Sequence, residues 1–322
     1  MARALLVPVI GGGPAGMSCA LWLANFGLRP LIVEREAALG GMGRLNPYRN
    51  DWLLGRPRET GRDNAAAFVQ HIKESGIATR LQARKLRVRR EAGDELTLEL
   101  ESAGVSEPER LACRSLVIAT GTRFRGEQWL NQVEGARLLA ASGRIHVGPS
   151  DAGNPAADLG RKVAIIGGGD NAFDVSRMLA ERGVRVILVV RSPRPRARPA
   201  LVDALRSHEA SGLAAVMPDC TVLSLARAGE RIRLNLSGGR RAEVDHVIVL
   251  FGYEPNSDAP WLVKLAPRKD PQGYLIVDEN MQSSSPAVFG IGDVANPAHP
   301  CVATAIGAGT VAARQIARQL RV

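Results

Sequence analysis

The sequence has no long hydrophobic run and few aromatic residues, and both shortages exclude classes of protein. No apolar run in the 322 residues reaches the roughly 18 residues that a membrane-spanning helix requires. Aromatic residues make up only 4% of the chain and do not interleave with a block of Arg and Lys, which disfavours nucleic-acid binding. The 45% of hydrophobic and 23% of charged residues are ordinary for a globular protein, so disorder, collagen and a disulfide scaffold are also excluded.

Cysteine is scarce as well, and its spacing excludes a metal cluster or a redox dithiol. The four cysteines, Cys19, Cys113, Cys220 and Cys301, lie far apart in the chain. This pattern indicates isolated thiols in a reducing compartment, and no metal site is expected. The apolar start, residues 1–10, runs directly into three glycines without a cleavage-like site. It therefore predicts a first β-strand and a cytoplasmic protein instead of a signal peptide.

The chain has 42 basic and 32 acidic residues, which gives a formal net charge of +10. Most of the basic residues are arginine. The skew reflects either genome composition or attraction to acidic partners such as phosphorylated cofactors and acidic carrier proteins. A basic stripe at Arg84, Lys85, Arg87, Arg89 and Arg90 leaves a similar choice. It is either a solvated strand face or a docking surface for an acidic carrier.

The length suggests two domains, and the chain contains the same order of elements twice. An apolar run that ends in a glycine triplet comes first, at 5–16 (LLVPVIGGGPAG) and at 162–172 (KVAIIGGGDNA). A helix-like stretch, a second apolar strand, alternating strand-like segments and a closing apolar strand with a glycine follow each run. These segments are 17–26, 30–33, 85–89, 96–100 and 116–121 in the first unit, and 173–182, 184–190, 221–226, 231–236 and 247–252 in the second. The repetition predicts an α/β protein with two doubly wound domains.

In the first unit, Gly11, Gly13 and Gly16 form a G-x-G-x-x-G turn between a strand and a helix. The first glycine allows the tight turn, the second lets the backbone approach a diphosphate, and the third lets the helix pack closely on the strand. Unpaired N–H groups at the helix N-terminus then favour negative charge. Glu34, at the end of the next strand, is placed to accept hydrogen bonds from ribose hydroxyls. These features predict a dinucleotide site, and the alternative is a structural glycine turn with a surface Glu.

The second unit carries the variant Gly167-x-Gly169-x-x-Ala172, and its second strand ends in Arg191 and Ser192 instead of an acid. An acid there would repel the 2′-phosphate of NADPH, whereas Arg pairs with it. Three further arginines follow in the next loop: Arg194, Arg196 and Arg198. The pattern predicts NADPH in preference to NADH, with a solvated Arg-rich loop as the alternative. Two different dinucleotide sites in one chain suggest FAD and a nicotinamide nucleotide.

Across nearly its whole length the chain resembles the thioredoxin reductase group of the pyridine nucleotide–disulfide oxidoreductases. The motifs that carry this resemblance are GGGPAG at 11–16, Glu34, Gly40-Gly41, Asp51-Trp52, Ala119-Thr120-Gly121, GGGDNA at 167–172, GYEPN at 252–256, Gly292-Asp293 and the run 303–313. The resemblance implies two doubly wound, three-layer (ββα) dinucleotide-binding domains and a homodimer. It implies an NAD(P)H-binding domain at 123–252, inserted into an FAD-binding domain formed by 1–122 and 253–322.

The resemblance also implies a set of cofactor-binding residues. Those for FAD are Gly11, Gly13, Pro14, Ala15, Gly16, Glu34, Gly41, Asp51, Thr120, Gly121, Gly292, Asp293, Cys301 and Val302. Those for NADPH are Gly167, Gly169, Asp170, Asn171, Ala172, Arg191, Ser192 and Arg196. Glu34 would hold the adenosine ribose of FAD, and Asp293 its ribityl–pyrophosphate region. Arg191 and Arg196 would hold the 2′-phosphate of NADPH, whereas Ser192 stands where the family usually has a second Arg.

One departure from the family concerns the chemistry. Thioredoxin reductases carry a CxxC motif shortly before the second glycine triplet, but here that stretch, 143–151, reads GRIHVGPSD. Other relatives carry a cysteine in the first glycine turn, where this chain has Ala15. Members without CxxC are similar to ferredoxin/flavodoxin–NADP⁺ reductases of the thioredoxin-reductase type. The expected function is therefore transfer of electrons from NADPH through FAD to an acidic carrier such as ferredoxin or flavodoxin.

Two alternative functions and two candidate catalytic residues remain open. The chain could instead reduce a small disulfide or another small oxidant, using Cys301 or the bare flavin. It could also be a flavoprotein redox sensor without enzymatic activity. Cys301 is a candidate for redox chemistry, or contributes only backbone beside the flavin. His146 is a candidate proton donor near the flavin, or a loop histidine without a role.

Overall fold

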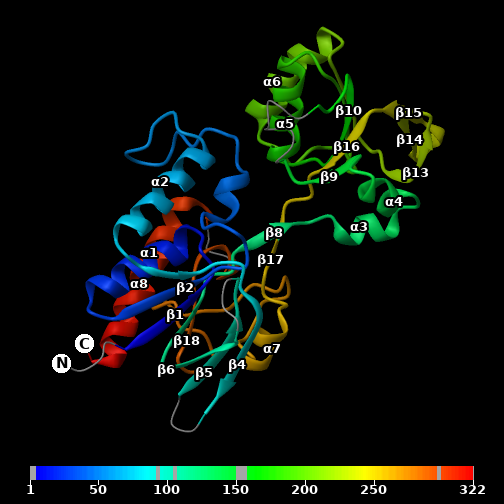
Figure 1. The fold of residues 1–322 in the computed structure, drawn as a ribbon. Coiled ribbons are helices and arrows are strands. Elements are labelled where there is room, and N and C mark those ends of the chain that lie inside the picture. Colours follow the sequence, from blue (N-terminus) through cyan, green and yellow to red (C-terminus); the bar gives the residue numbers. More distant parts are fainter. Residues whose placement is uncertain (1–4, 92–94, 104–106, 150–157, 296–298, 322) are drawn as a thin grey trace. The chain divides into compact units, whose positions relative to one another are not determined.

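The computed structural model describes residues 5–91, 95–103, 107–149, 158–295 and 299–321, and the chain forms two compact units (Figure 1). Unit 1 consists of Met1–Arg123 and Glu254–Val322, and unit 2 consists of Phe124–Tyr253. These divisions lie one residue beyond the boundaries expected from the sequence. Residues 1–4, at the start of the expected first strand, lie outside the described residues.

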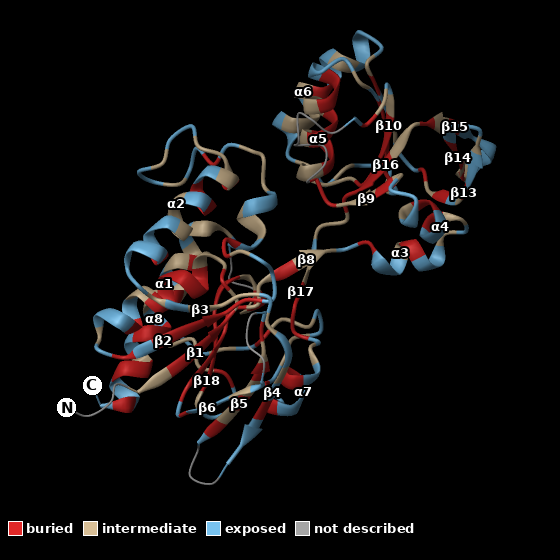
Figure 2. Ribbon diagram, viewed as in Figure 1, coloured by how far each residue is buried: buried red, intermediate tan, exposed pale blue. Residues whose placement is uncertain are grey.

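Unit 1 is built on a parallel five-stranded sheet in the order β18-β7-β1-β2-β3. Its strands are β1 (Leu6–Ile10), β2 (Arg29–Val33), β3 (Ala78–Arg80), β7 (Leu116–Ile118) and β18 (Val288–Gly290). The central strands are hydrophobic along almost their whole length because both faces of the sheet are covered. Figure 2 shows these strands as buried.

One face of this sheet is covered by helices and the other by a small antiparallel sheet. The helices are α1 (Pro14–Asn25), α2 (Gly61–Glu74) and α8 (Val302–Leu320). The antiparallel sheet has the order β4-β5-β6, with β4 at Arg84–Arg90, β5 at Leu96–Glu101 and β6 at Glu109–Cys113. Its apolar face joins the core that contains α7 (Pro260–Leu265). The predicted three-layer ββα architecture is confirmed.

Unit 2 repeats this architecture. Its parallel sheet has the order β12-β11-β10-β16-β9. The strands are β9 (Ile145–Val147), β10 (Lys162–Ile166), β11 (Arg185–Val189), β12 (Ala214–Met217) and β16 (His246–Val249). Its longer helices are α5 (Asp170–Glu181) and α6 (Pro199–Ala210), and its short helices are α3 (Glu127–Gln132) and α4 (Ala136–Ala141). A three-stranded antiparallel sheet consists of β13 (Val222–Ala228), β14 (Arg231–Leu236) and β15 (Arg241–Val244). None of the helices in the described residues is both long and apolar enough to cross a membrane.

The chain passes between the units along two paired strands, β8 (Thr122–Phe124) and β17 (Tyr253–Pro255). On the unit 1 side, Arg123 binds Glu254 at 2.8 Å and Asp258 at 2.9 Å. The hydrogen bonds to Asp258 and then to Glu254 raise the pKa of Arg123. The Arg123 guanidinium group on β8 therefore binds both β17 and the residues that follow it.

Pro8 lies within β1, and proline cannot donate a backbone hydrogen bond to a neighbouring strand. On one side, β1 pairs with β2 along its whole length, with Pro8 opposite Leu31. On the other side, the pairing with β7 begins only at Val9. Pro8 therefore interrupts no hydrogen-bond ladder with β7.

Helices α1 and α8 approach each other closely through Gly309. A Cβ at this position would lie 2.5 Å from the carbonyl oxygen of Ala15 and 2.8 Å from the backbone nitrogen of Cys19. The Ser18 hydroxyl donates a hydrogen bond to the Ile306 carbonyl oxygen at 2.8 Å. This contact joins the C-terminal segment of the chain to its first helix.

Replacing Gly309 with Ala should lower the free energy of unfolding by about 1–3 kcal/mol, because the added methyl group overpacks the contact with α1. Gly307 lies on the same helix but is exposed, and a Cβ there would meet no atom within 4 Å. Gly307→Ala should therefore raise the free energy of unfolding by up to about 1 kcal/mol, since Ala favours helix more than Gly does. Urea denaturation of both variants at the same FAD concentration measures the difference. Equal effects would contradict the close contact.

Candidate functional site

The first glycine turn of unit 1 is shaped by contacts that exclude side chains. Gly11 has a φ of +115°, and a Cβ on it would overlap the carbonyl oxygen of Ala119. A Cβ on Gly16 would overlap the carbonyl oxygen of Gly11. By contrast, the nearest atom to a Cβ on Gly13 would be the Cα of Gly41, at 3.9 Å. Gly11 and Gly16 thus permit close packing, whereas Gly13 leaves open space above the turn.

The N-terminus of α1 opens into this space. Gly13 is the N-cap residue and provides no side-chain hydrogen bond, and Pro14 begins the helix. The first turn contains no acidic residue, so its backbone N–H groups present a partial positive charge. This arrangement suits a phosphate group.

Glu34 follows β2 and is held at the same turn. Its side chain is buried, with Oε2 accepting a hydrogen bond from the Gly12 amide at 2.8 Å and Oε1 accepting one from the Glu36 amide at 2.9 Å. Two backbone donors therefore fix the orientation of the carboxylate. Each carboxylate oxygen has a further lone pair with which to accept a hydroxyl group.

Asp293 lies in the short helix η4 (Gly292–Ala295), which packs beside the start of α1. Gly292 has a φ of +69°, and a Cβ on it would lie 2.8 Å from the Cβ of Ala15. The Asp293 carboxylate forms no hydrogen bond or ion pair with the described residues, and burial raises its pKa. A half-buried carboxylate without such a partner is well suited to receive a polar ligand.

Thr120 and Gly121 follow Ala119, which packs against Gly11, and are bound to the second segment of unit 1. The Thr120 hydroxyl donates to the Asn256 carbonyl oxygen, and the Asn256 side-chain amide donates to the Thr120 carbonyl oxygen, both at 2.8 Å. The Asn256 backbone N–H also donates to the Gly121 carbonyl oxygen at 2.9 Å. Asn256 belongs to the GYEPN motif, but its bridging role was not foreseen from the sequence.

Two other expected FAD residues differ in their surroundings. Gly41 begins the short helix η1 (Gly41–Leu45), and a Cβ on it would lie 3.0 Å from the Cα of Gly13, so it belongs to the turn. Asp51 lies in an exposed turn, where its Oδ1 accepts hydrogen bonds from the Arg49 guanidinium at 3.0 Å and the Arg58 amide at 3.1 Å. The Asp51 carboxylate thus stabilises its own loop.

Cys301 is the N-cap residue of α8, directly before Val302. Its Sγ accepts a hydrogen bond from the Thr304 amide and lies 3.5 Å from the Thr304 hydroxyl oxygen. Burial opposes ionisation, but the hydrogen bonds from Thr304 and from the Ala303 amide outweigh it and lower the pKa of the thiol. The other three cysteines are buried. Burial raises the pKa of Cys113 to about 12, and it also raises the pKa of Cys19.

The glycine turn of unit 2 has the same construction. A Cβ on Gly167 would overlap the carbonyl oxygen of Leu250, whereas a Cβ on Gly169 would meet no atom within 4 Å. Gly169 is the N-cap residue of α5 and provides no side-chain hydrogen bond. Ala172, at the third position of the motif, is buried. The open space and the uncapped helix end therefore occur in both units.

Two polar residues in the first turn of α5 are already engaged. The Asp170 carboxylate accepts hydrogen bonds from the Arg198 amide at 2.8 Å and from its Nε at 2.7 Å. The Asn171 side-chain amide donates to the Tyr253 hydroxyl at 3.1 Å. Arg198 is thus a structural partner of the helix, a pairing that the order of residues in the loop does not reveal.

The arginine-rich loop after β11 folds back on the turn of unit 2. The Arg196 amide donates to the Gly168 carbonyl oxygen at 2.7 Å. The side chains of Arg191 and Arg196 are exposed and form no ion pair with the described residues. The Ser192 hydroxyl donates to the Arg194 carbonyl oxygen at 2.6 Å. Two guanidinium groups therefore remain available close to the uncapped helix.

His146 lies on β9 in unit 2. Its Nε2 is 2.8 Å from Nδ1 of His246 on the adjacent strand β16, and the two rings stack. Burial, and then the neighbouring His146 and Arg144, lower the pKa of His246. The role of His146 as a proton donor to flavin stays a prediction. Residues 150 and 151, which end the segment where relatives carry CxxC, lie outside the described residues.

Comparison with known proteins agrees with this architecture. The family model for pyridine nucleotide-disulphide oxidoreductases matches residues 6–315, and the chain belongs to this family. It is an NAD(P)H-dependent oxidoreductase, and oxidoreductases of this family bind FAD and NAD(P)H.

Individual relatives match the chain over almost its whole length. It is 26% identical to a ferredoxin–NADP reductase of Ignicoccus hospitalis, over 97% of both chains. It is 29% identical to a ferredoxin–NADP reductase of Limosilactobacillus fermentum, over 98% of this chain and 93% of the relative. The fold resembles the thioredoxin reductase of T. acidophilum with a TM-score of 0.81 at 21% identity, over 99% of this chain and 100% of the other.

Cys301 should be the cysteine that iodoacetamide modifies most rapidly in the native protein, because the other three are buried. Its rate of alkylation should rise with pH around a midpoint below that of an ordinary thiol, since only the thiolate reacts. Thr304→Val removes the hydroxyl next to the sulfur and should move this midpoint upward. Mass spectrometry of the labelled peptide measures both effects, with Cys301→Ser as the control. Comparable labelling of Cys19 or Cys113 would contradict the assignment.

Proposed function

We propose that the protein takes hydride from NADPH onto FAD and passes electrons to a carrier protein such as ferredoxin or flavodoxin. The observation that carries this proposal is an oxidoreductase architecture without a dithiol. The sequence contains no CxxC, and three of its four cysteines are buried in the units. A relay through a redox-active disulfide needs two neighbouring thiols, so electrons must leave the flavin by another route.

The residues around the first glycine turn fit FAD. The uncapped N-terminus of α1 and the open space above Gly13 suit its pyrophosphate, and the oriented Glu34 carboxylate suits its adenosine ribose. Asp293 has no partner among the described residues and would bind the ribityl–pyrophosphate region. Thr120 and Gly121, fixed by Asn256 of the second segment, would also contact the cofactor. FAD, when bound, accepts hydride and releases electrons singly or in pairs.

The other proposed FAD contacts are weaker or are made by backbone. Gly41 packs against Gly13 and shapes the turn, whereas Asp51 would act mainly by stabilising its loop. Cys301 and Val302 would lie along the flavin edge at the start of α8.

The residues around the second glycine turn fit NADPH. The uncapped N-terminus of α5 suits the pyrophosphate, and Arg191 and Arg196 would pair with the 2′-phosphate. Ser192 would offer a hydroxyl, which is a weaker anion ligand than a guanidinium. Asp170 and Asn171 would keep the first turn of α5 in place through their bonds to Arg198 and Tyr253.

The identity of the acceptor is supported by charge and by the relatives. A net charge of +10 favours an acidic partner. Two relatives that match over nearly their full lengths are named ferredoxin–NADP reductases. As part of the same proposal, the resemblance to the family suggests a cytoplasmic homodimer.

A second candidate function is the reduction of a small disulfide through Cys301. The lowered pKa of this thiol and its partial exposure favour that chemistry. The third reading, a redox sensor without activity, conflicts with membership of an oxidoreductase family.

Oxidation of NADPH should be coupled to the reduction of an acidic ferredoxin or flavodoxin, with cytochrome c as the final reporter. Thioredoxin should not be reduced, because the chain lacks the dithiol. Cys301→Ser should retain most of the carrier-dependent activity. Loss of that activity in Cys301→Ser, together with rapid reduction of a small disulfide by the wild type, would favour the second candidate.

Arg191→Ala should weaken NADPH binding by roughly 10–100-fold and leave NADH binding nearly unchanged. A hydrogen bond to a charged group contributes about 1.5–3 kcal/mol, and about 1.4 kcal/mol corresponds to a factor of ten. Arg185→Ala is a matched control, since Arg185 is exposed at the opposite end of β11. Stopped-flow reduction of the flavin at varied nucleotide concentration measures both affinities. An equal loss for NADPH and NADH would show that Arg191 supports the loop instead of the phosphate.

A further inference from the structure

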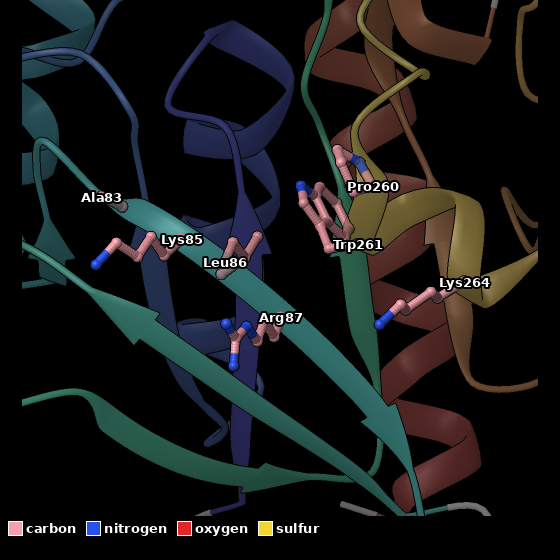
Figure 3. Close-up of a pocket in the computed structure, with 7 residues that line it drawn as sticks. All are labelled: Ala83, Lys85, Leu86, Arg87, Pro260, Trp261 and Lys264. Atoms are coloured by element: carbon pink, nitrogen blue, oxygen red, sulfur yellow. The ribbon is translucent and has the colours of Figure 1, made fainter.

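A surface pocket of about 460 Å³ lies between strand β4 and helix α7 of unit 1 (Figure 3). An apolar group and a cationic group of side chains line it. The apolar residues are Ala83, Leu86, Pro260 and Trp261, and the cationic residues are Lys85, Arg87 and Lys264. Figure 3 shows Trp261 and Lys264 extending from α7 toward β4, which carries Arg87. None of these residues belongs to the two cofactor sites.

Two of the three cations are not neutralised within the described residues. Lys85 forms an ion pair with Glu101 at 3.0 Å. Arg87 and Lys264 form no ion pair with the residues that the structure describes. The strand opposite offers Arg87 little compensation, because the Glu99 carboxylate in register with it already binds Arg110 at 3.0 Å. The pocket therefore has an uncompensated positive charge on both of its walls.

The positive charge continues beyond the pocket along β4. This strand has seven residues, RKLRVRR, and its exposed side chains are Arg84, Lys85, Arg87, Arg89 and Arg90. Seven strand residues extend over roughly 23 Å. A small anion would cover only part of this length, whereas the acidic surface of a protein would cover all of it.

The apolar floor adds a feature that electrostatic attraction alone does not require. Trp261 is only 8% exposed and packs in the core with Leu262 and Leu265. The floor of the pocket at Trp261 is therefore rigid. An apolar floor bordered by cationic side chains resembles the centre of a protein–protein interface, where an apolar side chain of the partner is inserted and the charged rim orients it.

Protection of a sheet edge accounts for only part of this arrangement. β4 is an edge strand, and cationic side chains on edge strands prevent unwanted pairing with other chains. That role does not require Lys264, which lies on α7, or an apolar floor. The strand also departs from regular pairing between Arg84 and Arg87, with Lys85 at a φ of +49°. Such a bulge redirects side chains locally.

The pocket begins close in sequence to the proposed FAD site. Pro260 lies four residues after Asn256, which binds Thr120 and Gly121. Four residues of chain extend over at most about 14 Å. A protein bound at the pocket would therefore lie near the loop to which the flavin is assigned.

We propose that the β4–α7 pocket is the docking surface for an acidic electron-carrier protein. The carrier inserts an apolar side chain against Trp261 and places carboxylates on Arg87 and Lys264. The inference rests on the proposed function, because it identifies where the carrier of that reaction binds. It adds an interaction surface outside the two cofactor sites.

The test compares two double variants with the same change in net charge. The first is Arg87→Glu/Lys264→Glu. The second, the control, is Arg314→Glu/Arg318→Glu on α8, where both arginines are exposed and without ion pairs in the described residues. Helix α8 covers the opposite face of the unit 1 sheet from β4. Calorimetric titration with an acidic ferredoxin and with an acidic flavodoxin, at low ionic strength, measures the dissociation constants.

The pocket variant should bind the carrier at least tenfold more weakly than the control variant, and its binding should depend less on salt. Reduction of a neutral quinone by NADPH should be unchanged in both variants, because neither pair lies in the proposed cofactor sites. Ala83→Leu, which fills the pocket without a change in charge, should also weaken carrier binding. Ala83→Leu therefore tests the apolar contact separately from the electrostatic attraction.

The outcomes separate this inference from the proposed function. Equal carrier binding by the two double variants would overturn the docking surface, even if the wild type reduces the carrier. Absence of carrier binding by the wild type would overturn it as well. Pocket-dependent binding without electron transfer would support the docking surface and contradict the proposed function. Binding that is lost in the pocket variant but unaffected by Ala83→Leu would overturn the proposed apolar contact.

Discussion

Close packing of backbone around the start of α1 is the constraint on which the rest of unit 1 depends. A side chain on Gly16 would overlap the carbonyl oxygen of Gly11, and a side chain on Gly309 would press on the carbonyl oxygen of Ala15. Helix α1 is therefore held tightly between β1 and α8, with its N-terminus directed at the open space above Gly13. The capacity to bind an anion there follows from the position of the helix and requires no cationic side chain.

The two units apply one construction to two different ligands. Both have an uncapped helix after a glycine turn, but the residue after the second strand differs in charge and in environment. Glu34 is buried and oriented by two backbone amides, whereas Arg191 is exposed and has no partner among the described residues. A carboxylate in the first unit suits ribose hydroxyls, and a guanidinium in the second suits a phosphate. In our proposal, this one position separates the FAD site from the NADPH site.

The cysteines explain why the route of the electrons is the main question for this protein. Cys19, Cys113 and Cys220 fill space in the cores, and burial raises the pKa of the first two. Hydrogen bonds at the start of α8 lower the pKa of Cys301. One such thiol does not make a dithiol relay. In our proposal, the basic surface at β4 and α7 provides a different route, through a docked partner.

The sequence by itself determined the order of the elements, the two glycine turns and the strand ends at Glu34 and Arg191, because these features depend on neighbouring residues. Only the tertiary structure decided which distant groups meet. Asn256 binds Thr120, from which it is separated by 136 positions in the sequence, and also binds Gly121. His146 pairs with His246, from which it is separated by 100 positions. The pairing of Arg198 with Asp170 and the lack of an ion pair at Arg87 in the described residues are likewise invisible in the chain order. Such contacts depend on which strands the sheets place side by side, and local patterns do not encode that placement.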